Sequence, residues 1–332
     1  MASTSISKSE KSYIQTSLQA STPLRADGRG LYDYRPIALE TGVAPLANGS
    51  ARLRLGQTAD SSGGTEILAG VKLEVEETES TEGRIICNVT CSPSAYPHVQ
   101  SNAIEDIAHD YTAILHEVLS HPSLLPPSLR ILPGRKAWVL SLDVLVISDA
   151  GNVYDAMFMA AQAALWDTKV PRTRAVEYRA QGGLSGGKDG GDMDVDAASQ
   201  SGFNVRAERA VADFELEDYW DEGDPLAGRD QWPVCVTLNL LPPMYYLDAT
   251  GPEEAATPLR LLLMYSAPAH AAPRLQGMRL LGSGEIDLSL IKSLVSSAQN
   301  HATELAGALR GKLKDEDLRR TEKARHKFSA TR

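Results

Sequence analysis

Residues 137–166 read AWVLSLDVLVISDAGNVYDAMFMAAQAALW, and this stretch decides the fold class. Residues 137–148 form a nearly continuous apolar run, rich in Val and Leu, with one interruption at Asp143. Such a run predicts a strand that is covered on both faces. Residues 155–166 are rich in Ala and Met and predict a closely packed helix. A buried strand followed by a buried helix predicts a domain of the α/β or α+β class.

Apolar periodicity extends this pattern to both sides. The capping box Ser7-Lys8-Ser9-Glu10 predicts the start of a short helix that ends near Gln19. Residues 102–119 carry apolar side chains every three or four positions and predict a second helix with one apolar face. A long helix is expected over residues 285–313. The expected strands cover residues 51–55, 66–76, 84–90, 234–240, 244–248 and 259–266.

A shift in composition divides the chain into two lobes. Residues 182–202 combine Gly, Ser and acidic residues with almost no bulky apolar side chain. Such a segment buries too little surface to offset the entropy of ordering it. The basic C-terminal tail is expected to fray. The predicted boundaries are 1–24 for an N-terminal helix and lead-in, 25–180 for a first lobe, 181–231 for a disordered Gly- and acid-rich insertion, 232–313 for a second lobe and 314–332 for the tail.

The composition bounds the function. The chain has 332 residues, 42% hydrophobic and 23% charged, with a net charge of −10, so non-specific nucleic-acid binding through overall basicity is excluded. Three cysteines without a C-x-x-C pair indicate a reducing compartment. The start lacks a signal-peptide core, and no apolar window is long enough for a membrane helix. A soluble intracellular protein without a membrane partner is expected.

Two motifs resemble a phosphate-binding loop and a zinc site, but each lacks a feature that such a site requires. Gly182 to Lys188 has the spacing of a phosphate loop, but Asp189 stands where the magnesium-binding hydroxyl belongs. Cys87 and Cys91 lie four residues apart on one predicted strand, too far apart to hold one zinc ion unaided. Buried thiols are the better interpretation. We therefore predict no metal and no cofactor.

Two further groups of residues leave alternatives open. Asp248 and Glu254 flank a Gly-Pro turn after an apolar strand, where paired carboxylates can hold magnesium or transfer a proton. Acidic residues are also common in turns for structural reasons. Local basic residues either bind phosphate, or they form a solvated rim or salt bridges to a neighbouring subunit. These basic residues are Arg130, Arg135, Lys136, Lys169, Arg172 and Arg174.

Several short stretches, in order along the chain, together resemble the RNase PH family, which includes phosphorolytic exoribonucleases and the ring subunits of the RNA exosome. The resemblance covers roughly residues 5–180 and 232–310. It implies an RNase PH-type fold of two βαβα-like halves with mixed sheets, helices on one side and a closing C-terminal helix. The matching stretches are Arg25-x-Asp27-Gly28-Arg29, Asp33-x-Arg35, Asn48-Gly49-Ser50-Ala51, Leu55-Gly56-Gln57-Thr58, Gly70-Val71-Lys72-x-Glu74-Val75, Asn88-Val89 with Ser92-Pro93, Trp138-Val139-Leu140-x-Leu142-Asp143-Val144 and Ala163-Ala164-Leu165-Trp166-x-Thr168-x-Val170-Pro171.

The resemblance also indicates which functional residues survive. Val153 stands where active members have a phosphate-binding arginine, so a charge-assisted contact to the attacking phosphate is lost. The two aspartates that active members carry six apart map onto Asp248 and Glu254, so these are vestigial candidates. The helix over 102–119 has Asp106, His109 and Asp110 instead of phosphate-gripping arginines. The resemblance assigns contact with RNA only to Arg135 and Lys136.

The resemblance therefore implies a catalytically inactive ring subunit of the eukaryotic RNA exosome. Its expected partners are other RNase PH-like ring subunits, RNA-binding cap subunits, a hydrolytic 3′–5′ exoribonuclease and single-stranded RNA. The expected location is the nucleus, nucleolus and cytoplasm, with roles in rRNA processing and RNA decay. The alternative is an active phosphate-dependent 3′–5′ exoribonuclease in which another basic residue replaces the lost arginine.

Overall fold

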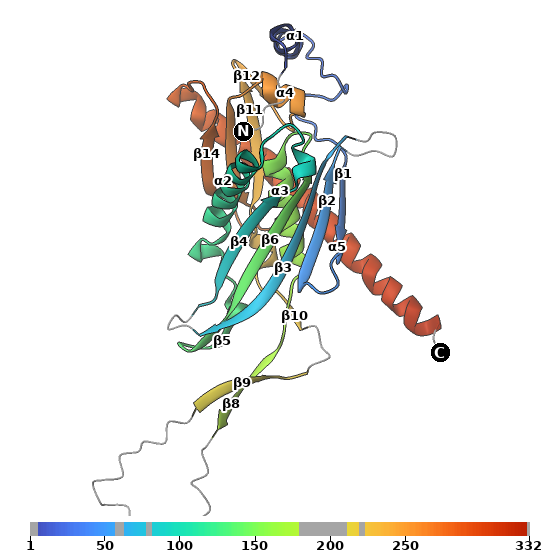
Figure 1. Cartoon of the computed structure of the whole chain (residues 1–332), viewed down its shortest axis with the longest axis vertical. Coiled ribbons are helices and arrows are strands. Elements are labelled where there is room, and N and C mark those ends of the chain that lie inside the picture. Colours follow the sequence, from blue (N-terminus) through green and yellow to red (C-terminus); the bar gives the residue numbers. More distant parts are fainter. Residues whose placement is uncertain (1–5, 57–62, 78–81, 179–210, 219–222, 331–332) are drawn as a thin grey trace, which may run out of the picture.

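A computed structural model describes residues 6–56, 63–77, 82–178, 211–218 and 223–330 of the chain. Two sheets share one continuous core (Figure 1). The first sheet has the strand order β1-β2-β3-β6-β4, with β5 paired to β6. Only β4 and β6 run parallel, so this sheet is mixed as expected. Its strands are β1 Ile37–Thr41, β2 Gly49–Leu55, β3 Thr65–Glu77, β4 Arg84–Cys91, β5 Arg130–Leu132 and β6 Lys136–Ser148.

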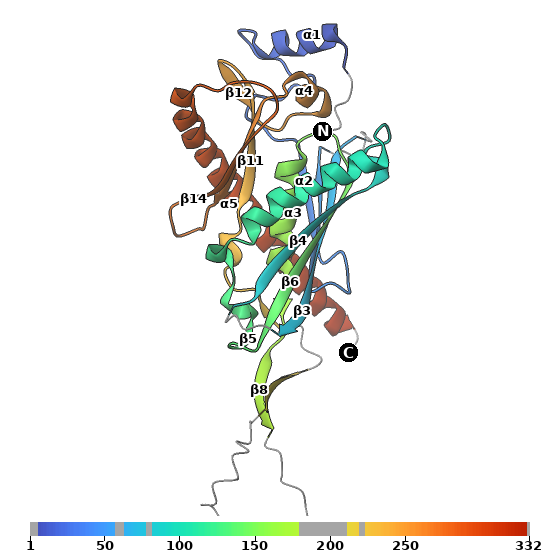
Figure 2. The same cartoon turned by 60° about the vertical axis from the view of Figure 1, so that its left-hand side comes forward.

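The sequence predicted that strand β6 is covered on both faces. The structure shows this only at its start, where Ala137 and Val139 are buried, and from Ser141 onward one face is covered. Leu140, Leu142, Val144 and Val146 point into the core, whereas Asp143 on the other face is exposed. The sequence suggested burial on both faces because Leu145 and Ile147 are apolar. In the structure these two side chains lie on the open face and are half-buried. The helices therefore lie on one side of the first sheet (Figure 2).

The second sheet has the order β12-β11-β13-β14, and all its pairings are antiparallel. Its strands are β11 Val234–Leu241, β12 Met244–Tyr246, β13 Arg260–Ser266 and β14 Arg274–Leu281. The expectation of mixed sheets is thus correct for the first sheet and wrong for the second. Antiparallel neighbours follow because short connections join β11 to β12 and β13 to β14, and such connections suit antiparallel pairs.

Helix α3, Val153–Asp167, joins the two sheets. All its side chains except Asp167 are buried, because it packs against β2 and β3 on one side and β11 on the other. Its many Ala residues let both sheets approach closely, which explains the composition noted in the sequence. The surrounding helices are α1 Lys8–Leu18, capped by the Ser7 hydroxyl; α2 Ser101–Leu119, which covers β4; α4 Gly251–Ala256, which contacts α1; and α5 Leu288–Ala330, which covers β11 and β13.

The prediction that residues 181–231 form a disordered insertion is partly wrong. Within it, β9 Val211–Leu216 pairs with β8 Thr173–Tyr178 as a ribbon that projects from the body (Figure 1), and β10 Asp224–Pro225 pairs with β7 Lys169–Val170. The base of the ribbon is fixed because the Phe214 ring packs edge-on against Trp138 at 6.3 Å. Residues 182–202 lie outside the described residues. This range includes Gly182 to Lys188, which has the spacing of a phosphate loop.

The basic tail over residues 319–332 was expected to fray, but α5 continues to Ala330. Contacts with α3 hold this part of the helix. The Trp166 indole donates a hydrogen bond to Asp317 at 2.9 Å, and Arg320 forms an ion pair with Asp167. In the part of the chain that the structure describes, no helix is long and apolar enough to cross a membrane.

Candidate functional site

Asp248 follows β12 at the junction of the two halves and is completely buried. The Arg35 guanidinium donates to Oδ1 at 2.8 Å and to Oδ2 at 3.0 Å, and Arg29 donates to Oδ2 at 2.8 Å. Burial opposes ionisation, but hydrogen bonds from Arg35 and its positive charge hold the pKa of Asp248 below its usual value. Asp248 is thus an ionised anchor, and both of its oxygens are occupied.

A second buried ion pair lies beside the first. Arg25 donates to both carboxylate oxygens of Glu253, at 2.9 and 2.6 Å. The same guanidinium donates to the backbone carbonyls of Leu247 and Asp248 at 3.0 and 2.6 Å. Arg25, Arg29 and Arg35 all come from the segment between α1 and β1, so this segment ties the second half to the first.

The loop between β6 and α3 completes the junction. Arg35 donates to the carbonyls of Ala150 and Gly151 at 3.0 and 2.9 Å. Gly151 has φ +97°, and a Cβ there would come within 2.4 Å of the Ala249 carbonyl, so glycine is required by both conformation and space. Asn152 has φ +59° and is buried. A left-handed Asn next to a left-handed Asp248, at φ +45°, is a strained arrangement that its contacts maintain.

Asn152 bridges the carboxylates of Asp248 and Glu254. Its side-chain amide donates to Asp248 Oδ1 at 3.0 Å, and its backbone N–H donates to Glu254 Oε1 at 2.7 Å. Arg260 contacts the same Glu254 oxygen at 3.0 Å. Asp248 and Glu254 are therefore brought near one another, as the sequence suggested, but each already holds an arginine.

Asp155 is a buried carboxyl that the sequence did not single out. It accepts hydrogen bonds from Thr237 at 2.7 Å, Tyr34 at 2.9 Å and Asn152 at 3.1 Å. Burial raises its pKa from 3.8 to about 6, because neutral donors offset the loss of solvation only in part. The sequence signal that could have identified Asp155 is its position as an acidic residue in a segment that is otherwise rich in Ala and Met.

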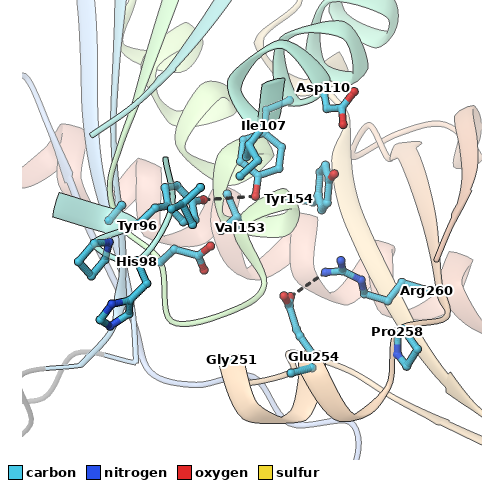
Figure 3. Close-up of a pocket in the computed structure, with 16 residues that line it drawn as sticks. Tyr96, His98, Ile107, Asp110, Val153, Tyr154, Gly251, Glu254, Pro258 and Arg260 are labelled. Carbon is cyan, nitrogen blue, oxygen red and sulfur yellow. Dashed lines mark hydrogen bonds and ion pairs between the residues drawn. The ribbon is translucent and has the colours of Figure 1, made fainter. Parts of the chain in front are cut away.

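A cavity of about 870 Å³ opens beside this junction, between α2, the loop that follows β4, α3 and α4 (Figure 3). Val153 and Glu254 both line it. Val153, where the resemblance places a lost phosphate-binding arginine, is one of the residues of the cavity wall, and its role stays a prediction. The remaining charged lining is acidic except for Arg260, which is paired with Glu254.

The predicted RNA contacts lie elsewhere. Arg135 and Lys136 are at the turn between β5 and β6, at the end of the first sheet away from α4 (Figures 1 and 2). Arg135 is exposed, whereas Lys136 is paired with Asp213 at 2.8 Å. Three of the other basic residues also have acidic partners, and these partners belong to the same chain. These pairs are Arg130 with Glu82, Arg172 with Asp224 and Arg174 with Glu215.

The described residues contain no group of three or more His, Cys, Asp or Glu side chains arranged to hold a metal ion. Cys87 and Cys91 lie on β4, where burial raises the pKa of the Cys87 thiol to about 12. That thiol is therefore protonated near neutral pH and is a poor metal ligand.

The anchoring role of Asp248 predicts the effect of Asp248→Asn. Removing this charge leaves the buried Arg35 without its carboxylate and takes away one of the two carboxylates that Arg29 contacts, so the free energy of unfolding should fall by about 3 kcal/mol or more. Chemical denaturation measures this change. Asp143→Asn, at an exposed carboxylate on β6, is the matched control and should change stability by less than about 0.5 kcal/mol. Equal effects for the two variants would contradict the anchoring role.

The raised pKa of Asp155 predicts a pH-dependent contribution to stability. The folded state binds this proton more tightly than the unfolded state, so the contribution is complete below pH 3.8 and is lost as the pH rises through about 6. Asp155→Asn cannot titrate. The stability of the unmodified protein relative to this variant should therefore fall, on the order of 3 kcal/mol, between pH 4 and pH 7. A difference that stays constant over this range, measured by urea denaturation, would show the assignment to be wrong.

Comparison with known proteins relates this arrangement to a family. Residues 33–171 match the RNase_PH family, described as "3' exoribonuclease family, domain 1". A Dictyostelium discoideum protein named as an exosome complex exonuclease RRP42 is 25% identical over 346 residues, 89% of this chain and 93% of the relative. The exosome complex component Rrp42 of Sulfurisphaera tokodaii is 37% identical over 153 residues, and the match spans 45% of this chain and 53% of that protein.

Within the family, residues 48–51, 70–76 and 163–173 had suggested similarity to the subunit called ribosomal RNA-processing protein 42, and the names of these relatives confirm it. A chain of the Archaeoglobus fulgidus exosome, solved with RNA bound to its active site, has a TM-score of 0.62 and 22% identity over 91% of this chain and 97% of that chain. This likeness confirms the RNase PH-type fold. Residues 33–171 therefore match domain 1 of the 3′ exoribonuclease family, and the chain has the RNase PH-type fold.

Proposed function

We propose that this chain is a catalytically inactive ring subunit of an RNA exosome. One observation carries the inactive part of the proposal: the charge of the cavity at the junction. Asp110, Asp149 and Glu254 line this cavity, and Arg260 is the Lys or Arg side chain among the lining residues, which also include His98. Arg260 is already held by Glu254 at 3.0 Å.

Phosphorolysis needs an inorganic phosphate beside the RNA backbone, and catalysis of phosphoryl transfer depends on positioning these anions with cations. A cavity whose carboxylates outnumber its cations repels both reactants. Val153 supplies no charge at the position where the family has an arginine. The vestigial carboxylate Asp248 is buried and held by Arg29 and Arg35, so it has no free oxygen for a metal or a proton.

The relatives support the assembly part of the proposal. Proteins named as exosome complex components share this sequence family, and an exosome chain shares the fold. We propose that the chain pairs with other RNase PH-like subunits to form a channel, that RNA-binding cap subunits cover this ring, and that a separate hydrolytic 3′–5′ exoribonuclease degrades the RNA. Ribosomal RNA precursors and messenger RNAs in the nucleus, nucleolus and cytoplasm are the proposed substrates of that assembly.

The inactive role predicts the outcome of a phosphorolysis assay. The purified chain, incubated with single-stranded RNA, inorganic phosphate and magnesium, should release no nucleoside diphosphate. The assembly isolated from cells should degrade RNA at the same rate when its copy of this chain carries Glu254→Gln. Phosphate-dependent release of nucleoside diphosphates that disappears in Glu254→Gln would instead establish the alternative, an active phosphorolytic 3′–5′ exoribonuclease.

A further inference from the structure

Strand β14, Arg274–Leu281, forms one edge of the second sheet (Figure 1). Among the described strands it pairs with β13 alone, so the backbone N–H and C=O groups along its outer side lack a ladder partner. Proteins usually protect such an edge with a short strand, a Pro or a covering element. This strand is eight residues long and contains no Pro, so its edge can accept a further strand.

One face of β14 presents an apolar row to solvent. Leu275, Met278 and Leu280 are 43%, 51% and 46% exposed, and each stands opposite a residue from one alternating set of β13 that includes Tyr265. Side chains that stand opposite one another share a face of the sheet. The Tyr265 hydroxyl donates to the Val295 carbonyl of α5 at 2.8 Å. The row therefore lies on the face where α5 packs against β11 and β13, but it is left open to solvent.

The other face of β14 carries positive charge. Arg274 and Arg279 are exposed and stand opposite Ser266 and Leu262, which belong to the other alternating set of β13. The strand contains no Asp or Glu, and neither arginine has an acidic partner in the part of the chain that the structure describes. A partner strand with carboxylates on this face would complement these charges.

This charge argues against a second copy of the chain as the partner. Pairing two copies of β14 edge to edge would place four arginines on one two-stranded ribbon, without a carboxylate on either strand. Like charges in neighbouring cross-strand positions destabilise such a pair. A strand of different sequence, with acidic residues in alternate positions, avoids this repulsion.

We propose that β14 pairs with a β-strand of a different protein chain, whose apolar side chains cover the exposed apolar row and whose carboxylates meet the two arginines. Main-chain hydrogen bonds then provide affinity, and the alternating side chains provide specificity. The inference rests on the proposed function in one respect: a neighbouring subunit of the ring supplies the strand.

Amide hydrogen exchange tests this pairing, by comparison of the purified chain with the complex isolated from cells. A partner strand takes the outward N–H groups of residues 274–281 into hydrogen bonds, so these groups should exchange at least about tenfold more slowly in the complex. Strand β13 is the internal control, because it already has a paired strand on each side and should change little.

The outcomes separate the pairing from the proposed function. A hetero-oligomer in which residues 274–281 exchange as fast as in the purified chain overturns the pairing and leaves the proposed function standing. A homo-oligomer with a protected β14 identifies a second copy as the partner and overturns the inference. A chain that purifies alone contradicts both the pairing and the proposed function.

Substitutions on β14 test the two faces separately. Leu280→Lys places a charge in the apolar row, and Arg279→Glu reverses a charge on the other face. Each should lower the amount of other subunits that purifies with the chain about tenfold, whereas Arg279→Lys should largely retain them. Leu318→Lys, at a 64% exposed side chain on α5, is the matched control and should retain them fully.

Urea denaturation checks that the variants fold. All these side chains are exposed, so the unfolding midpoints should match that of the unmodified chain. Full recovery of the other subunits by both Leu280→Lys and Arg279→Glu would refute the pairing, and so would an equal loss in Leu318→Lys.

Discussion

The buried contact between Asp248 and Arg35 is the constraint on which the rest of the junction depends. A carboxylate with no exposure to solvent must be compensated within the protein, and here two guanidinium groups and an amide provide the compensation. Arg35 also binds the carbonyls of Ala150 and Gly151, and this contact fixes the loop before α3. Asn152 in that loop then reaches Asp248, Asp155 and Glu254. One ion pair therefore sets the positions of the others.

This arrangement explains why a site with carboxylates need not be an active site. Asp248 and Glu254 come together, but Arg29 and Arg35 occupy both oxygens of Asp248, and Arg260 holds one oxygen of Glu254. The buried contacts of Asp248 contribute to cohesion between the two halves of the chain, which fits the inactive role that we propose. The open cavity beside the junction keeps its acidic lining without the cations that a phosphate requires, and this charge is what separates the proposed function from that of an enzyme.

Much of the fold could be predicted from sequence because burial on one face leaves a regular pattern. Strands β2, β3, β4, β11 and β13 and helices α2 and α3 lie within a few residues of their predicted positions. Strand β14 was missed because it lies at the edge of its sheet with most side chains exposed, so apolar and polar residues do not alternate cleanly. Strand β9 was missed because the composition of the neighbouring segment masked it, and the extension of α5 depends on contacts with α3 that no local pattern reveals.

The site was predictable only in outline. The arginines of the Arg25 to Arg35 segment and the turn at Asp248 were visible as separate motifs, but their pairing joins residues more than 200 positions apart, which one sequence does not disclose. The most direct test of the central claim, that these residues build a structural subunit, is the native mass and composition of the complex that purifies with this chain from its own cells. A hetero-oligomer that contains several different RNase PH-like subunits is the predicted result, and a homo-oligomer of this chain alone would contradict the account.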